Sequence, residues 1–354
     1  MVMKMKNSDV KQIENIYSRT DVFDIRWRVT TLCNYQCDFC IQGNREEHLR
    51  QAQGESSDLR NRICDAVISL IEGFEGYKRV KIGLIGGEVS IIKEFPDILK
   101  RLAQCNFSGE IRFSITTNFS ADVTWFYNLI DQFKQGAGHR KRSLSISASF
   151  YPEYVSIEQF GEKLRDISLY SGVRKHKKWM SGILKRFGSD KGGKISISAG
   201  IPIIDDMDYE MLVNTKTAFQ DTGVRVFPII IRNYDTSLSD RNLKQLIKRE
   251  NKLLKVTDIN DKTMLFPTIQ SLGAALDNTD TFCPTGYLCD AGIRNIWIDA
   301  FGNVKRCPTI GRAMPMGSIL DGTFKLYDGP RPCISDHCSC GVYGKIKKVS
   351  QDMQ

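Results

Sequence analysis

Three cysteines near the N-terminus, Cys33, Cys37 and Cys40, have the spacing C-x3-C-x2-C within the stretch TTLCNYQCDFCIQ. Thiolates are soft ligands that select zinc or iron–sulfur clusters. A structural zinc site usually pairs cysteines as C-x2-C and takes four protein ligands. No fourth cysteine and no histidine lies within this stretch. Three thiolates on one short loop suit a cubane [4Fe–4S] cluster with one iron left free. We therefore predict an iron–sulfur cluster, with zinc as the alternative.

The elements that must position this loop alternate between strand and helix patterns. A β-rich run at 23–30 leads directly into Cys33. Further strands are predicted at 79–87, 110–118, 142–150, 194–204 and 224–232, and helices at 56–74, 95–105, 121–133, 156–170 and 208–223. About six β-α units predict a parallel sheet with helical crossovers. In such folds the chemistry lies at the C-terminal ends of the strands, where the cysteine loop falls.

The cysteine loop resembles the signature of radical S-adenosylmethionine (SAM) enzymes, in which an aromatic residue, here Phe39, precedes the third cysteine. The resemblance implies that SAM chelates the free iron through its amino and carboxylate groups. The cluster would pass an electron to SAM, break the S–C5′ bond and yield a 5′-deoxyadenosyl radical, while the protein positions and shields the cofactors. The resemblance covers residues 23 to 232 and implies an α/β fold, a partial (β/α)6 TIM-like barrel.

A second motif lies where this family predicts it, one β-α unit after the cysteines. Gly86, Gly87 and Glu88 end the second predicted strand. The family's GGE motif at this place contacts the SAM amino group. Glycines let the backbone approach a ligand closely, and a carboxylate suits an ammonium group. The combination with C-x3-C-x2-C is far more specific than GGE alone.

Further SAM contacts are predicted at the ends of later strands, where the family uses polar residues. Asn118 ends the third strand, and Arg232, at the end of the sixth, could meet the SAM carboxylate. Ser147 and Ser149 share one face of the fourth strand, because side chains alternate along a strand. For each of these residues a plain loop or capping role is the alternative.

The C-terminal segment carries six more cysteines and a hairpin pattern. Cys289, Gly302 and Cys307 form the pattern C-x12-G-x4-C. The sequence DAFGN within it is typical of a hairpin turn. This resembles the opening of the SPASM/twitch extension of radical SAM enzymes, which implies an auxiliary [4Fe–4S] cluster. The later spacing, C-x4-C-x-C, departs from the full SPASM pattern and favours one cluster of the shorter twitch type. The predicted ligands are Cys289, Cys307, Cys338 and Cys340, with Cys283 and Cys333 in reserve. A zinc site, with His337 as a candidate ligand, is the alternative.

Composition places the chain among ordinary globular proteins. It has 354 residues, 41% hydrophobic and 26% charged, with no apolar run long enough for a membrane span and no secretory signal. Its net charge of +9 mildly favours anionic ligands, but charge alone does not favour nucleic-acid binding. Eleven cysteines without an export signal predict metal binding in a reducing cytoplasm rather than disulfides. Cys64 and Cys105 stand alone in helical patterns and are predicted to be small buried side chains.

Four regions are expected along the chain. They are an N-terminal helical extension at 1–22, the radical SAM barrel at 23–235, a helical linker at 236–277, and a small cysteine-rich hairpin module at 278–354. Residues 173–194 interrupt the barrel rhythm with eight Lys/Arg against one Asp. This basic insertion is interpreted as a solvated surface excursion, or alternatively as a lid or docking surface for an acidic substrate.

Three functional hypotheses follow. Modification of a peptide or protein is slightly favoured, and hydrogen abstraction from a small molecule such as a sugar, cyclitol or nucleotide-linked substrate is close behind. A non-catalytic iron–sulfur or zinc protein is the third, and the GGE placement counts against it. The predicted partners are a peptide or small-molecule substrate, acidic or phosphorylated, and an external electron donor of the flavodoxin or ferredoxin type. No membrane partner is expected.

Overall fold

The structure, a computed structural model, describes residues 21–37, 40, 45–172, 193–203, 206–219, 224–230, 253–257, 263–267, 287–289, 291–307, 315–334 and 348–350. Several predicted features lie outside these residues: Phe39, Arg232, Cys283, Cys338, Cys340, nearly all of the N-terminal extension, and residues 173–192 of the basic insertion.

The first two thirds of the described chain alternate strand and helix, as expected. The strands are β1 (Val22–Thr30), β2 (Arg79–Gly86), β3 (Glu110–Thr117), β4 (Arg142–Ser149), β5 (Lys194–Ile203) and β6 (Arg225–Ile230). The helices are α2 (Arg45–Gln51), α3 (Ser57–Glu72), α4 (Phe95–Gln104), α5 (Val123–Ala137), α6 (Ile157–Ser171) and α8 (Asp206–Ala218), with a 3-10 turn, η2 (Val89–Ile91), after β2. Of these elements, α2 was not predicted.

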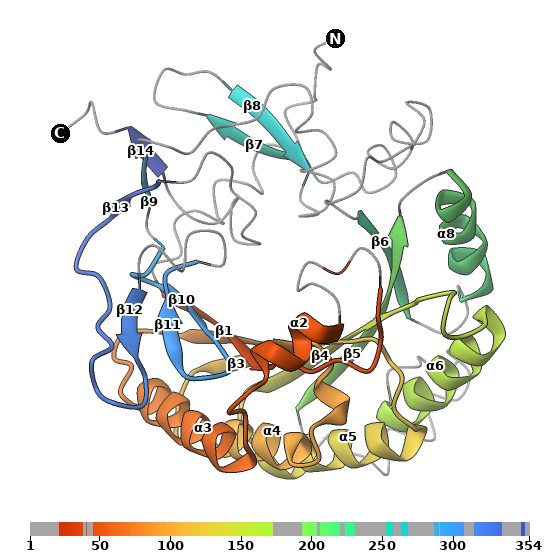
Figure 1. Ribbon diagram of the computed structural model, residues 1–354, viewed down its shortest axis with the longest axis horizontal. Helices are drawn as coiled ribbons and strands as arrows, with labels where there is room; N and C mark the ends of the chain where they lie inside the picture. Colours follow the sequence, from red (N-terminus) through yellow and green to blue (C-terminus); the bar gives the residue numbers. More distant parts are fainter. Residues whose placement is uncertain are drawn as a thin grey trace.

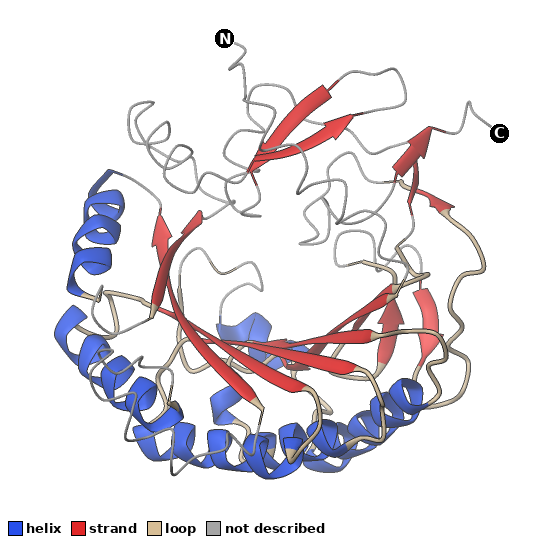
Figure 2. Cartoon of the chain, turned by 180° about the vertical axis from the view of Figure 1, so that it is seen from behind, coloured by secondary structure: helices blue, strands red, loops and turns tan. Residues whose placement is uncertain are grey.

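β1 to β6 pair in parallel and in sequence order. The sheet curves, and helices α3 to α6 and α8 follow one another along its convex side (Figures 1 and 2). We call these strands and helices the half-barrel. The predicted fold class, an α/β chain with a partial TIM-like barrel, is confirmed.

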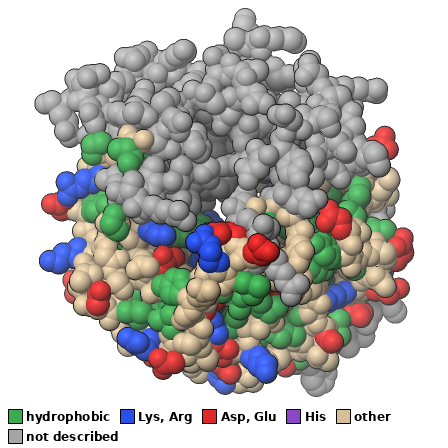
Figure 3. Space-filling model, viewed as in Figure 1, with side chains coloured by type: hydrophobic (Ala, Val, Ile, Leu, Met, Phe, Trp, Pro, Cys, Tyr) green, Lys and Arg blue, Asp and Glu red, His purple; other side chains and the backbone are tan. Residues whose placement is uncertain are grey.

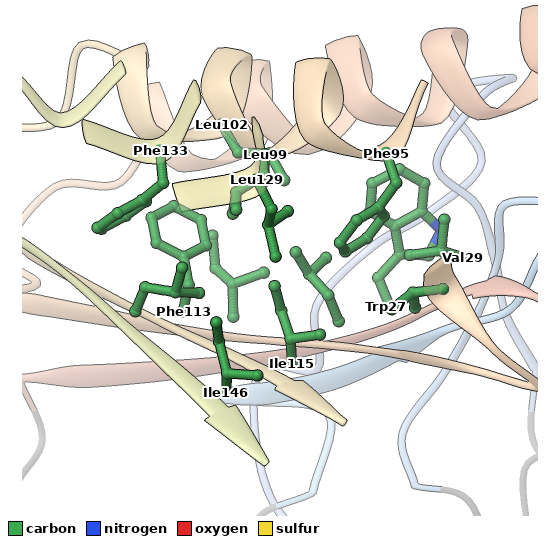
Figure 4. Close-up of a cluster of buried hydrophobic side chains, with 14 of the residues drawn as sticks. Trp27, Val29, Phe95, Leu99, Leu102, Phe113, Ile115, Leu129, Phe133 and Ile146 are labelled. Atoms are coloured by element: carbon green, nitrogen blue, oxygen red, sulfur yellow. The ribbon is translucent and has the colours of Figure 1, made fainter. Parts of the chain in front are cut away.

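The hydrophobic core lies between the sheet and its helices. In β3, Ile111, Phe113 and Ile115 are buried, whereas the alternate residues are exposed or half-buried. Figure 4 shows Phe113, Ile115 and Ile146 on the sheet facing Leu99, Leu102, Leu129 and Phe133 of α4 and α5. Each large apolar side chain that is fully buried contributes about 1.5–3 kcal/mol. The convex face of the sheet is therefore what holds the half-barrel together.

The concave face is polar. The alternate positions of β3 carry Arg112, Ser114 and Thr116, all exposed. Ser145 and Ser147 of β4 pair with Ser114 and Thr116 in the register and are half-buried. A closed TIM barrel fills its interior with branched apolar side chains. The hydroxyl-rich concave face instead suits an interior that receives a polar ligand.

The C-terminal hairpin joins the same sheet. β10 (Asn295–Ile298) lies parallel to β1, and β11 (Asn303–Lys305) and β12 (Pro315–Ser318) continue the sheet in antiparallel order. The predicted DAFGN turn is present: Asp299 accepts hydrogen bonds from the backbone of Phe301 and Asn303 at 3.0 Å. Gly302 has φ +83°, a conformation that favours glycine. The hairpin extends the half-barrel sheet to nine strands.

Two smaller sheets complete the described structure. β9 (Tyr287–Cys289) pairs with β13 (Arg331–Pro332) and β14 (Lys348–Ser350). β7 (Leu253–Thr257) and β8 (Thr263–Pro267) form an antiparallel pair. The helical linker expected over 236–277 is thus wrong for these two segments. Both contain β-branched or aromatic residues, and strand pairing prevailed over the charged helical pattern that precedes them.

Two further observations concern the length of the helices and the charge of the surface. No helix among the described residues is both long and apolar enough to cross a membrane. On the face shown in Figure 3, acidic and basic side chains are interspersed over the described residues.

Candidate functional site

The cysteine loop leaves the C-terminal end of β1, and Glu55 fixes its base. The Glu55 carboxylate accepts hydrogen bonds from the hydroxyls of Thr30 and Thr31, both at 2.6 Å, and from the Thr31 N–H at 2.7 Å. Arg60 of α3 lies 3.4 Å from the same carboxylate. Within the loop, the Cys40 N–H donates to the Cys37 carbonyl at 3.0 Å. The residues that begin the loop, Thr30 and Thr31, are therefore held in place by the Glu55 carboxylate.

The Gly86-Gly87 pair packs against this loop. The Gly87 N–H donates to the Thr30 carbonyl at 3.0 Å, and the Glu88 N–H donates to the Leu32 carbonyl at 2.7 Å. A Cβ at Gly87 would lie 2.5 Å from the Leu32 carbonyl carbon and closer still to its oxygen. At Gly86 it would lie 2.8 Å from the Thr30 oxygen. In this structure the glycines are needed because the chain's own cysteine loop approaches them.

Glu88 is fully buried and joins the ends of two strands. Its carboxylate accepts hydrogen bonds from the Ser90 N–H at 2.9 Å, the Thr117 hydroxyl at 2.7 Å and the Asn118 N–H at 2.5 Å. Burial raises the pKa of the Glu88 carboxyl, and the hydrogen bonds from Asn118, Thr117 and Ser90 act in the opposite direction. The side chain holds the end of β3 beside the loop, and its predicted contact with SAM stays a prediction.

Asn118 connects this carboxylate to the first cysteine. Its side-chain N–H donates to Asn34 at 2.9 Å and lies 3.9 Å from the Cys33 sulfur. The Tyr35 N–H donates to the same sulfur at 3.4 Å. A sulfur that accepts several N–H donors is suited to the negative charge of a cluster thiolate.

The third cysteine has a histidine neighbour that the sequence analysis missed. His48 of α2 is buried, and its Nε2 lies 3.5 Å from the Cys40 sulfur. The spacing of the histidines in the sequence indicated no pair of metal ligands. The contact of His48 is instead with the Cys40 sulfur, eight residues away. This contact depends on the position of α2 beside the cysteine loop, which the sequence pattern did not indicate.

The three cysteines of the loop remain the predicted ligands of a cluster, and all three are half-buried. Burial raises the pKa of Cys33 and raises that of Cys37 to about 12. A metal favours the thiolate form of the cysteines that bind it. Among the described residues, no three His, Cys, Asp or Glu side chains converge on one metal-ion position. A cubane does not require such convergence, since each thiolate binds a different iron.

A group of tyrosines, which we call the tyrosine clamp (Tyr35, Tyr151 and Tyr154), holds the loop from the other side. The rings of Tyr35 and Tyr154 stack with centroids 3.8 Å apart, and Tyr151 meets Tyr35 edge-on at 5.8 Å. The Gln36 N–H donates to the Tyr154 hydroxyl at 2.7 Å. The clamp ties the cysteine loop to the segment after β4. No local pattern predicted it, since its members are distant in sequence.

Replacing Tyr154 by phenylalanine should loosen the cysteine loop while keeping the ring stack. The Gln36 N–H then loses its acceptor, and a net hydrogen bond is worth about 1 kcal/mol, or roughly fivefold in local opening. Hydrogen–deuterium exchange over residues 34–37 measures this. Tyr170→Phe is the matched control, because Tyr170 also stacks on a tyrosine, at 4.0 Å, and donates to Asp131 at 2.6 Å. Equal loop exchange in both variants would contradict the role of the clamp.

The two serines of β4 differ in their surroundings. Ser147 is half-buried on the concave face, opposite Thr116 and Ser198 in the register. Ser149 is buried, and its side chain hydrogen-bonds Tyr151 of the clamp. Both remain predictions as SAM contacts. Through its hydrogen bond with Tyr151, Ser149 also helps to orient the tyrosine clamp.

Three C-terminal cysteines lie in one neighbourhood. Cys289 on β9 pairs with Arg331, two residues before Cys333. The Arg306 guanidinium is buried beside Cys307 and donates to the carbonyls of Pro332, at 3.1 Å, and Arg331, at 3.3 Å. Cys289, Cys307 and Cys333 are all buried. The structure thus brings one predicted reserve, Cys333, near the two predicted hairpin ligands.

No family model matches the chain. Two curated relatives match part of it: GTP 3′,8-cyclase of Edwardsiella ictaluri, 27% identical over 110 residues, and GTP 3′,8-cyclase of Tolumonas auensis, 31% identical over 124 residues. These segments are 31% and 35% of this chain. The chain thus matches about a third of the relatives' own length, 30% and 32% respectively.

Solved structures resemble the fold over most of the chain. A histidine-tagged anSMEcpe with bound AdoMet has a TM-score of 0.46 at 13% identity, over 85% of this chain and 76% of that one. Streptococcus suis SuiB bound to precursor peptide SuiA has a TM-score of 0.49 at 12% identity, over 89% of this chain and 66% of that one. At these identities and TM-scores the likenesses carry no argument about activity.

The site consists of a three-cysteine loop at the C-terminal edge of a parallel half-barrel, hydrogen-bonded to a GGE turn. Together with the cyclase similarities, it supports a place for the chain among the radical SAM enzymes.

Proposed function

We propose that this chain is a radical SAM enzyme that abstracts hydrogen from its substrate. The observation that carries the proposal is the construction of the cysteine loop. Its base is held by Glu55, its side by Gly87 and Glu88, and its first sulfur by Asn118. When bound, a [4Fe–4S] cluster and SAM would supply a 5′-deoxyadenosyl radical for this reaction.

The residues of the chain have separate tasks in this proposal. Cys33, Cys37 and Cys40 would hold three irons and leave the fourth for SAM. Gly86, Gly87, Glu88, Asn118, Ser147 and Ser149, together with Phe39 and Arg232 outside the described residues, are the proposed surroundings of SAM. The tyrosine clamp covers one side of the loop and would limit access of water to it. An external flavodoxin or ferredoxin would supply the electron.

The concave face favours a small polar substrate. Ser114, Thr116, Ser145 and Ser147 present hydroxyls toward the space that the sheet curves around. The curated relatives are named for an activity on GTP, itself a polar small molecule. Modification of a peptide or protein, which the sequence analysis slightly favours, is the second candidate. The cysteine-bearing C-terminal hairpin, with its resemblance to SPASM/twitch enzymes, supports it.

We further propose one auxiliary [4Fe–4S] cluster in the C-terminal segment. Cys289 and Cys307 are its first ligands, and the register of β9 with β13 supports Cys333 as a third. Cys338, Cys340 and Cys283 remain candidates for the rest of the set. A buried Arg306 between the hairpin and β13 would hold this neighbourhood together and favour the negative charge of the thiolates.

Anaerobic reconstitution with iron and sulfide tests both proposals at once. The protein should bind about eight irons, four for each cubane cluster, and with a reductant should convert SAM to 5′-deoxyadenosine. Iron analysis and chromatography of the products are the measurements. A preparation that binds about four irons and cleaves SAM would defeat only the auxiliary cluster. Full iron loading with no cleavage of SAM would defeat the proposed function.

A further inference from the structure

Two arginines of β1 point toward the concave face. Ile25, Trp27 and Val29 are fully buried, and Figure 4 shows Trp27 and Val29 on the helix side of the sheet. Side chains alternate along a strand, so Arg26 and Arg28 lie on the opposite face. Both arginines therefore stand on the same face as the hydroxyls of β3 and β4.

The charge and the position of the Arg26 side chain are explained by its contacts with Asp24 and Gly83. Its Nε lies 3.4 Å from the Asp24 carboxylate. Its side chain also lies across Gly83 of β2, where a Cβ would come within 2.6 Å of the Arg26 Cδ. A glycine at this position leaves room for a guanidinium that lies flat and pairs within its own strand.

Arg28 has no such partner. Its Nε is buried, and within the described part of the chain no hydrogen bond or ion pair reaches the guanidinium. Burial lowers the pKa of Arg28, while Asp299, Cys40 and Glu55 act in the opposite direction. An arginine nevertheless stays charged in proteins. A partly buried charge without a partner costs several kcal/mol unless an anion completes it.

The nearby carboxylates are already engaged. Glu55 accepts from Thr30 and Thr31 and pairs with Arg60. Asp299 lies 3.3 Å from the Lys305 ammonium and accepts from Asn303 of the hairpin turn. Neither forms a hydrogen bond with Arg28. The guanidinium is thus close to Cys40 of the cysteine loop, and its buried Nε has no hydrogen-bond partner among the described residues.

Rows of hydroxyls cross β3, β4 and β5 on the far side of β2. In the register, Arg28 lies opposite the apolar Ile85 of β2. Thr116, Ser147 and Ser198 form one hydroxyl row on β3, β4 and β5. Ser114, Ser145 and Ser196 form the row beneath it. A row of hydroxyls suits the oxygens of a sugar, a nucleotide or another polar molecule whose anionic end is bound elsewhere.

We propose that Arg28 binds an oxyanion of the substrate, a phosphate or a carboxylate, and that the hydroxyl rows of β3 to β5 bind the polar remainder. The proposal rests on the proposed function and names the substrate class of the same site. Guanidinium binds both oxyanions through paired N–H donors. The cysteine loop would then lie beside the anionic end of the substrate.

The experiment uses anaerobically reconstituted protein with SAM, titrated calorimetrically with pyrophosphate and, separately, with succinate. At least one probe should bind, and Arg28→Gln should weaken its binding by roughly 10- to 100-fold, the usual value of a charge-assisted hydrogen bond. Arg112→Gln is the matched control. Arg112 stands on the same face but is paired with Glu110 at 2.7 Å, so binding should change by less than about threefold. The probe that responds identifies the oxyanion.

Three results would overturn the proposal: neither probe binds the wild type, Arg28→Gln binds the probe as tightly as the wild type, or Arg28→Gln weakens binding of SAM and not of the probe. The last would assign the guanidinium to the SAM carboxylate. Iron content and thermal midpoint of each variant show that it is folded and loaded. Cleavage of SAM by the wild type tests the proposed function separately, so an enzyme that cleaves SAM and binds no probe defeats this inference alone.

Discussion

Replacing Cys37 by alanine should reduce cleavage of SAM to the background rate. A cubane held by three thiolates loses one of its protein ligands, and the remaining two cannot retain all four irons in place. Iron bound after reconstitution should fall by about four atoms per chain, the content of one cubane cluster. 5′-Deoxyadenosine and iron are the two measurements.

Cys105→Ala is the matched control for this change. Cys105 is a buried thiol and Cys37 a half-buried one, and burial raises the pKa of both. Cys105 follows α4, far along the chain from the cysteine loop. Its variant should retain iron content and SAM cleavage. A Cys37→Ala protein that still forms 5′-deoxyadenosine would refute the assignment of the loop.

Replacing Gly87 by alanine should destabilise the protein and prevent loading of the same cluster. The new Cβ would overlap the backbone of Leu32, which cannot move without breaking the hydrogen bonds that Gly87 and Glu88 make to the loop. Overpacking typically lowers the free energy of unfolding by about 1–3 kcal/mol. Because the neighbour here is backbone, which cannot change its rotamer, we expect a loss of about 3 kcal/mol. The thermal midpoint should fall by roughly 5 °C or more.

Gly73→Ala provides the control for inserting a methyl group at a glycine. Gly73 follows α3 with φ −79°, and a Cβ there would meet its nearest atom, the Ser69 carbonyl oxygen, at 3.5 Å. Its stability should change by no more than about 0.5 kcal/mol, with iron loading unaffected. If Gly87→Ala loads iron and melts like Gly73→Ala, the close packing of the GGE turn is not needed for the site.

The half-barrel could be predicted because its signals are local. The strand expected at 110–118 forms β3 at Glu110–Thr117, with alternating burial as the pattern predicts. The helix expected at 156–170 forms α6 at Ile157–Ser171, whose N-terminus carries a capping box between Ser156 and Gln159. Periodicity and capping act over a few residues, so they can be recognised without knowledge of the fold.

The supports of the cysteine loop could not be predicted in this way. Tyr154 lies far from Tyr35 in sequence, the contact of His48 with Cys40 depends on the position of α2, and β10 pairs with β1 across most of the chain. Such contacts depend on how elements pack, which no short-range pattern encodes. Within the linker expected over 236–277, the two described segments, 253–257 and 263–267, are strands for the same reason, since their pairing supplies contacts that a local pattern does not encode.

The sequence by itself determined the chemistry that is available. C-x3-C-x2-C supplies three soft ligands, which suit a cubane cluster with its fourth iron free, and the GGE turn one β-α unit later marks the same end of the sheet. Only the tertiary structure decided how those residues act. It turned Glu88 inward to hold Asn118 beside Cys33, and it placed Arg28 on a concave face lined with hydroxyls. Ligand type is a property of each side chain, whereas burial, partners and direction follow from the packing of distant strands and helices.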